Sequence, residues 1–530
     1  MAILNGCIVD GGGGMPYISD VGVDKGKIVR IGKGQRIPAR KELDASGKYV
    51  TPGFIDVHRH EDAAVFASGF GELQIRQGIT AGINGNCGLS VAPFPRNRRA
   101  EIARYLKPII GNLPREAEFD TFSEYLALVE TRSLALNFGM LIGNGALRRA
   151  VKGFASGGLS PEEIRKAQGY LEDALESGAF GASLGLAYIP ENLFDARECI
   201  ELLAPLRGGG VLLTAHIRGE GDSLTASVEE AAGIAEGLSA PLHISHFKCI
   251  GQKNWGWLLE KALETLDCAK ERIPRITFDV YPWTAGSTQL AQILPPALLE
   301  GGLEKTAERL KDPRVRKECK DILKTGQTRF DNLVELAGWE NIMVSSVQTE
   351  KNQRHIGKRI SEIAAEQGAD PFDAAFDLLA EEHGNVAMVD FIVCEQDIET
   401  IVRRPESLIV SDSTYPAGGR PHPRQYGTYT KFLSEYVRDR KILPLETAIR
   451  KITGGPAEVF SIPHKGFVKE GYDADLAVFD LAEIQNHATY LDPCQFGTGF
   501  AAVIVNGEIA SLCDQFLGCA AGKVLRRTRF

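Results

Sequence analysis

The chain has 530 residues, of which 44% are hydrophobic and 24% are charged, as in ordinary globular proteins. This composition excludes disordered, collagen-like and coiled-coil proteins. The formal net charge is −9, and the only dense basic stretch is the tail at residues 523–530. We therefore expect no nucleic-acid partner, because phosphate binding would need a basic surface.

The cysteines and the apolar segments give expectations about location. The ten cysteines are scattered and include no Cys-x-x-Cys pair, which favours reduced thiols over a disulfide framework in a chain of this length. The first residues lack the pattern of a signal peptide, and no run of about 18 apolar residues occurs. We expect a cytoplasmic protein with no membrane partner.

Both ends of the chain contain short strand-like runs separated by glycine turns. Near the C-terminus, Ala474–Phe479 and Ala502–Val505 are typical of strands, and the second is followed by Asn506-Gly507, a pair that favours a hairpin. We therefore predict a small β-sandwich domain that is assembled from residues 1–52 and 456–530.

Between these ends, residues 53–455 alternate short apolar runs with amphipathic stretches. Eight runs are predicted to be strands: Phe54–Val57, Gly78–Ile83, Leu136–Ile142, Ala179–Leu184, Val211–Thr214, Pro241–Ile244, Ile276–Val280 and Leu408–Val410. Helical periodicity covers 160–177, 224–236, 255–271 and 359–381. Eight strands alternating with helices are typical of a (β/α)8 TIM barrel, an α/β fold. The stretch of about 292–350 is too long for one crossover, so we predict an inserted, mostly helical lid there.

Polar side chains follow the predicted strands at their carboxyl ends, where the active sites of such barrels lie. Six residues share this placement: His58, His60, Cys87, His216, His246 and Asp412. Residues two apart on a strand point to the same face, so His58 and His60 can enter the barrel mouth together. His243 has an odd offset from His246, and we expect it to face the opposite side.

Each of these residues alone is also compatible with a packed or surface position. Together, a cysteine and several histidines from different strands supply the thiolate and imidazoles that Zn²⁺ binds, with one position left for water. Asp412 would then take a proton from that water and deliver it to a leaving group. The pattern therefore predicts a zinc-dependent hydrolase.

The motifs that carry these residues resemble the amidohydrolase superfamily, and within it the N-acyl-D-amino-acid deacylase (D-aminoacylase) family. The matching segments are Thr51–His60, Gly85–Pro93, Gly185–Tyr188, His216–Glu220, His243–Lys248, Asp279–Thr288, Ser411-Asp412, His422–Thr428 and Gly471–Asp480. The resemblance implies hydrolysis of N-acyl-D-amino acids, as small-molecule substrates, to a carboxylate and a free D-amino acid. The alternative is a cyclic-amide hydrolase of the hydantoinase or dihydroorotase kind, against which Cys87 and the segment 281–287 weigh.

The resemblance also implies which residues bind the metal. It assigns a tightly bound zinc to Cys87, His216 and His246, and a second, weaker metal position to His58 and His60. In many relatives a carboxylated lysine bridges two metals. Residues 174–190 contain no lysine, which agrees with Cys87 taking that place. The number of bound metals stays open.

Five further residues are implied to contact the substrate: Lys248, Tyr281 and Arg424 as a clamp for its carboxylate, with Tyr188 and Ser287 lining the pocket. The segment 413–420 departs from the usual glycine-leading pattern of the family, so Arg420 is an alternative to Arg424. The sequence leaves open whether the D-amino acid is acidic or neutral, which acyl group is preferred, and whether the chain forms a homo-oligomer.

Overall fold

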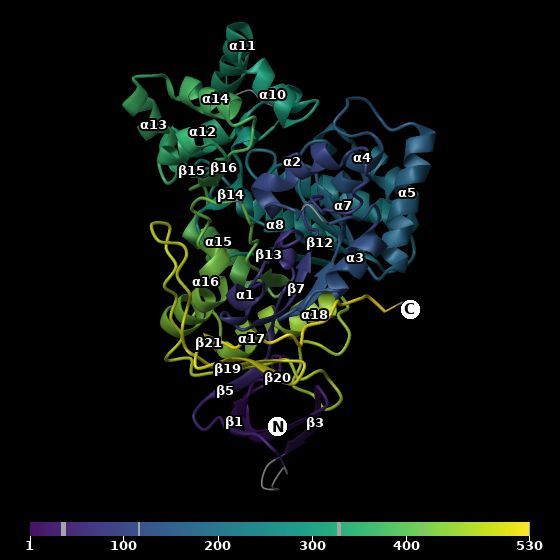
Figure 1. The fold of residues 1–530 in the computed structure, drawn as a ribbon, viewed down its shortest axis with the longest axis vertical. Helices are drawn as coiled ribbons and strands as arrows, with labels where there is room; N and C mark the ends of the chain where they lie inside the picture. The colour runs from purple at the N-terminus through teal and green to yellow at the C-terminus, as the bar shows by residue number, and fades with distance from the viewer. Residues whose placement is uncertain (33–38, 115–116, 326–329, 417, 529–530) are drawn as a thin grey trace.

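The structure is a computed structural model that describes residues 1–32, 39–114, 117–325, 330–416 and 418–528. Along its long axis, a β-sheet made by the two chain ends lies at one end, an α/β barrel lies in the middle, and a largely helical insertion lies at the other end (Figure 1). Among the described residues, no helix is both long and apolar enough to cross a lipid bilayer.

Within the described residues, eight parallel strands form a closed barrel. In chain order they are β6 (Phe54–Asp56), β7 (Ile79–Asn84), β8 (Asn137–Met140) with its continuation β9 (Ile142–Gly143), β10 (Gly181–Gly185), β11 (Leu212–His216), β12 (Leu242–Ile244), β13 (Ile276–Val280) and β17 (Ser407–Ile409). The backbone N–H of His60 donates to the carbonyl of Ser413 and closes the barrel beside β17. The barrel predicted from the apolar runs is confirmed.

Helices cover the outside of the barrel, as crossovers between parallel strands require. The predicted helices at 160–177, 224–236 and 255–271 correspond to α5 (Pro161–Glu176), α7 (Leu224–Leu238) and α8 (Trp257–Ala269). Further helices are α1 (Glu72–Ile75), α2 (Arg99–Ile110), α3 (Phe122–Glu130), α4 (Asn144–Val151), α6 (Ala196–Leu202), α15 (Glu395–Arg403), α16 (Arg424–Lys431), α17 (Leu445–Ile452) and α18 (Gly454–Val459).

The stretch 359–381, expected to be helical throughout, is divided into two helices. They are α13 (Ile360–Gln367) and α14 (Pro371–Glu381). Gly368 adopts a φ of 62° and ends the first helix, a conformation that glycine reaches without steric cost. Pro371 then begins the second helix, where its missing N–H is not needed, and Asp370 caps it.

The two chain ends share one sheet. The described residues contribute nine strands: β1 (Ala2–Ile8), β2 (Tyr17–Asp24), β3 (Lys27–Gly32), β4 (Glu42–Asp44), β5 (Tyr49–Pro52), β18 (Leu476–Phe479), β19 (Phe500–Val505), β20 (Glu508–Leu512) and β21 (Gln515–Phe516). Antiparallel pairing of β5 with β18 joins the two ends, and purple and yellow strands lie together in Figure 1. Hydrogen bonding runs continuously through these nine strands. The division of the chain at residues 52 and 455 stays a prediction.

The insertion between β13 and β17 is larger and less helical than the expected segment of about 292–350. It contains α9 (Pro296–Leu299), α10 (Leu303–Arg309), α11 (Pro313–Lys324) and α12 (Leu333–Ala337), together with α13 and α14. It also contains an antiparallel sheet in the order β14 (Gly286–Gln289), β16 (Ala387–Asp390), β15 (Ile342–Ser346). Strands β14 and β16 lie outside the expected bounds, because their pairing is between segments about a hundred residues apart and leaves no local signal in the sequence.

Candidate metal centre and substrate cavity

The polar residues predicted at the strand ends converge at the carboxyl end of the barrel. The Sγ atom of Cys87 lies 3.3 Å from Nε2 of His58 and 3.5 Å from Nε2 of His246. The ring of His216 packs against that of His246 with their centroids 4.4 Å apart. All four side chains are more than nine-tenths buried. Residues that are far apart in the chain therefore form one cluster of soft and borderline metal donors.

Asp412 joins this cluster from the end of the eighth strand. Its Oδ1 lies 3.4 Å from Nε2 of His58 and 3.4 Å from Nε2 of His60. Its Oδ2 lies 2.9 Å from Nη1 of Arg424, which is the first residue of α16. Burial alone would raise the pKa of Asp412, but the charges of Arg424 and His58 outweigh burial and hold that pKa well below its usual range.

The backbone at the site adopts conformations that side chains other than glycine rarely take. Cys87, His246 and Asp412 have φ angles of 56°, 37° and 49°. Each lies in the turn that directly follows a barrel strand, and left-handed backbone there costs free energy for a residue with a Cβ atom. Three residues of one cluster share this conformation. The packing of the surrounding fold must therefore offset the free energy that these backbone conformations cost.

Two carboxylates that the sequence analysis did not assign orient the imidazoles. Oδ2 of Asp279, in β13, lies 3.3 Å from Nδ1 of His58. Oδ1 of the same side chain accepts a hydrogen bond from the backbone N–H of His246. The same Oδ2 lies 2.8 Å from Nε2 of His243, which is also buried. Glu220 lies 2.9 Å from Nδ1 of His246. Such partners fix which ring nitrogen faces a metal.

The donor set fits a zinc ion. Three groups of side chains each bring their ligand atoms within 4.8 Å of one another: His58 with Cys87 and His246, His58 with His60 and Asp412, and His216 with Glu220 and His246. Burial would raise the pKa of the Cys87 thiol, but His58 and His246 lower it well below its usual range. A thiolate among imidazoles and carboxylates suits Zn²⁺. The group that contains Cys87 includes His58, which the resemblance assigns to the weaker metal position. The division of the ligands into a tightly bound and a weakly bound set therefore stays a prediction.

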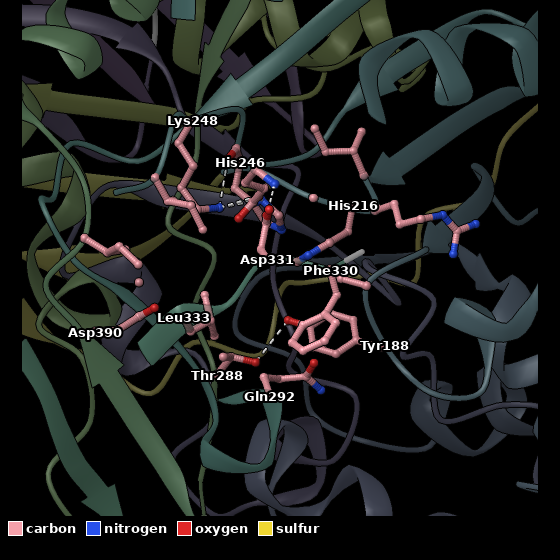
Figure 2. A pocket seen from close by; sticks show the side chains of 18 of the residues that line it. Tyr188, His216, His246, Lys248, Thr288, Gln292, Phe330, Asp331, Leu333 and Asp390 are labelled. Atoms are coloured by element: carbon pink, nitrogen blue, oxygen red, sulfur yellow. Dashed lines mark hydrogen bonds and ion pairs between the residues drawn. The ribbon is translucent and has the colours of Figure 1, made fainter. Parts of the chain in front are cut away.

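A cavity with an empty volume of about 850 Å³, part of it open to solvent, adjoins the donor cluster. All five residues expected to contact the substrate line it: Tyr188, Lys248, Tyr281, Ser287 and Arg424. Figure 2 shows Tyr188 and His216 on one side of this cavity, with the hydroxyl of Tyr188 3.1 Å from Oγ1 of Thr288.

The two basic residues of the proposed clamp lie in this cavity with acidic partners. Nζ of Lys248 lies 2.6 Å from Oε1 of Glu220. The guanidinium of Arg424 lies 4.6 Å above the ring of Tyr281. The alternative residue, Arg420, is not among the described residues that line the cavity, and its guanidinium lies against Gly357. The structure therefore favours Arg424 over Arg420.

A closed (β/α)8 barrel with Cys, His and Asp side chains at its mouth suits a metal-dependent enzyme, and comparisons with known proteins define its class. Residues 328–510 match the amidohydrolase family. The chain is 32% identical to D-aminoacylase of Alcaligenes xylosoxydans xylosoxydans, with 100% of this chain and 98% of that protein aligned. It is also 32% identical to N-acyl-D-aspartate deacylase of the same organism, over 96% of this chain and 91% of that protein.

Solved structures give the same result. The crystal structure of N-acyl-D-glutamate deacylase from Bordetella bronchiseptica, complexed with zinc and a phosphonate inhibitor, matches with a TM-score of 0.83 at 30% identity and covers 99% of both chains. A D-hydantoinase from a Bacillus species has a TM-score of 0.56 at 15% identity, a likeness of fold alone. The chain belongs to the N-acyl-D-amino-acid deacylase (D-aminoacylase) family of the amidohydrolases. The resemblance found in the motifs is confirmed.

Proposed function

We propose that this chain hydrolyses the amide bond of N-acyl-D-amino acids. Water is added across the C–N bond, and a carboxylic acid and a free D-amino acid are released. The observation that carries the proposal is the convergence of Cys87, the buried imidazoles and Asp412 on a cavity that also presents Lys248 and Arg424. The D configuration rests on the relatives, a D-aminoacylase and an N-acyl-D-aspartate deacylase.

Zinc is the proposed cofactor, and the relative solved with zinc supports it. Cys87, His216 and His246 would hold the tightly bound ion, and His58 and His60 would contribute to a second, weaker position. When bound, zinc lowers the pKa of a coordinated water and polarises a carbonyl group. The buried thiol and imidazoles of this chain match the ligands that catalytic zinc takes in proteins.

Asp412 is the proposed acid–base residue. Its Oδ1 faces the imidazoles of His58 and His60, and its Oδ2 is held by Arg424. We propose that Oδ1 accepts a proton from the attacking water while a bond forms between the water oxygen and the acyl carbon. As the C–N bond breaks, the same oxygen delivers the proton to the departing nitrogen.

The remaining cavity residues bind and orient the substrate. Lys248, Tyr281 and Arg424 are proposed to hold the carboxylate of the amino acid, since Arg and Lys supply charge-assisted hydrogen bonds to such a group. Tyr188 and Ser287 line the adjoining wall. The ring of Tyr188 lies 4.7 Å from that of His216, which places the tyrosine next to the donor cluster.

The cysteines support a cytoplasmic location. All ten lie in the described residues, and none of them forms a disulfide. Free thiols persist in reducing compartments, so we propose that the protein acts in the cytoplasm.

The proposal is tested by a deacylation screen with zinc analysis on the same preparation. N-acetyl-D- and N-acetyl-L-amino acids are compared with a hydantoin, and the release of free amino acid is measured. We expect zinc to co-purify and D substrates to react fastest. Faster release from the L series, or turnover of the hydantoin alone, would overturn the proposal in favour of a different amide hydrolase.

A further inference from the structure

An acidic side chain of the insertion that forms no ion pair within the described residues lines the substrate cavity. Asp390 ends strand β16 and lines the cavity, on the opposite side from His216 (Figure 2). It is 6% exposed, and its Oδ1 is buried with no hydrogen-bond partner among the described residues. Burying a carboxylate oxygen without a partner costs free energy. The position of Asp390 therefore points to a partner that enters the cavity.

The backbone around Asp390 leaves room for this carboxylate. Gly286 of β14 is paired with Asp390 in the antiparallel sheet. A Cβ atom at Gly286 would lie 2.6 Å from Oδ1 of Asp390, closer than such atoms approach. The glycine therefore keeps the carboxylate unobstructed in its observed orientation.

The cations of the cavity differ from Asp390 because each forms an ion pair, although Nε and Nη1 of Arg424, like Oδ1 of Asp390, have no hydrogen-bond partner among the described residues. Among the described lining residues, the cations are Lys248, Arg424 and Arg218, which pair with Glu220, Asp412 and Glu230. Asp331 accepts the backbone N–H groups of Glu220 and Gly221. A substrate with an acidic side chain carries a second carboxylate. Among the described lining residues, that carboxylate would have to compete with Glu220, Asp412 or Glu230 for a cation.

We propose that Asp390 selects N-acyl-D-amino acids whose side chains are cationic, with an amine or guanidinium at the end of an aliphatic stem. This inference rests on the proposed function. The side-chain cation would donate a charge-assisted hydrogen bond to the carboxylate of Asp390, and Leu294, Leu299 and Leu333, which also line the cavity, would pack against the stem. An acidic side chain would instead meet a buried like charge.

The test must be run at a pH at which the carboxyl group of Asp390 is ionised. Burial raises the pKa of this carboxyl to about 6, against the lowering effect of nearby Lys248. At about pH 8 the carboxylate is therefore ionised, and the lysine-type amine is protonated.

The test compares N-acetyl-D-lysine with N-acetyl-D-norleucine, which has the same stem without the amine, and with N-acetyl-D-glutamate. For the zinc-loaded wild type at about pH 8, we expect kcat/KM for the lysine substrate to exceed that for norleucine by roughly tenfold or more. The glutamate substrate should be the poorest. The variant Asp390→Asn should lose the lysine preference while its kcat/KM for norleucine stays near the wild-type value.

Asp331→Asn is the matched control, because it removes one negative charge from the same cavity at a carboxylate that already has partners. It should keep the lysine-to-norleucine ratio. Equal loss of the ratio in both variants would mean that the general charge of the cavity, and not Asp390, sets the preference. A wild-type ratio near one would overturn the inference while norleucine turnover upholds the proposed function. Failure of every D substrate would contradict the proposed function itself.

Discussion

The two walls of the substrate cavity come from different parts of the chain and are built differently. The barrel wall presents His216 and His246 at the ends of parallel strands, with Cys87 beside His246 and with carboxylates as partners of the imidazoles. The insertion wall presents Thr288 and Asp390 from a small antiparallel sheet, and leucines from the segments around it. The barrel wall carries the proposed chemistry and the insertion wall carries the proposed choice of side chain. Changes to the first should reduce turnover of every substrate, whereas changes to the second should alter their ranking.

The largest effect is expected at Asp412 on the barrel wall. Asp412→Asn keeps the size of the side chain but replaces the carboxylate with an amide, which cannot accept and deliver the proton. We expect kcat to fall by about two to four orders of magnitude for all substrates, the usual contribution of an acid–base group. Zinc content is measured on the same samples. Near-normal turnover at full zinc occupancy would remove Asp412 from the mechanism.

A smaller effect on the metal is expected at Glu220, whose carboxylate contacts Nδ1 of His246. Glu220→Gln removes the charge that faces Nδ1 of His246. We expect zinc affinity, measured by competition with a chelator, to fall by about 10- to 100-fold, as for other partners of metal ligands. Glu382→Gln is the control, because this buried carboxylate of the insertion binds the backbone of Thr349 instead. Equal losses in both variants would show a general effect of removing a buried charge.

The smallest effect is expected at the contact that joins the two walls. The hydroxyl of Tyr188, on the barrel side, lies 3.1 Å from Oγ1 of Thr288 in the insertion. Thr288→Val removes this hydrogen bond at nearly constant volume. A bond worth about 1 kcal/mol predicts a roughly fivefold fall in kcat/KM that differs between substrates, with zinc affinity unchanged. A fall as large as that of Asp412→Asn would contradict the separation of the two walls.

The barrel wall was largely predictable from the sequence because strand periodicity fixes where each strand ends. His58 and His60 follow an apolar run and share a face, and Asp412 follows another. Glu220 and Asp279 were not assigned, although both lie in recognised motifs. A carboxylate near a strand end gives the same pattern whether it contacts a metal, an imidazole or water, and only the folded side-chain positions distinguish these cases.

The insertion wall was not predictable for a different physical reason. Asp390 faces the cavity because β16 pairs with β14, and these strands are about a hundred residues apart in the chain. Short strands of this kind have neither the length nor the alternation that marks a strand in a sequence. The same limit explains why the expected insertion of about 292–350 omitted both strands.

The central claim is that a thiolate and imidazoles from separate strands bind one zinc ion. Zinc K-edge X-ray absorption on the purified protein tests this claim most directly, with Cys87→Ser as the comparison. The account predicts a sulfur neighbour at about 2.3 Å together with imidazole nitrogens at about 2.0 Å, and loss of the sulfur in the variant. A shell of nitrogen and oxygen alone in the wild type, or a sulfur that persists in Cys87→Ser, would contradict it.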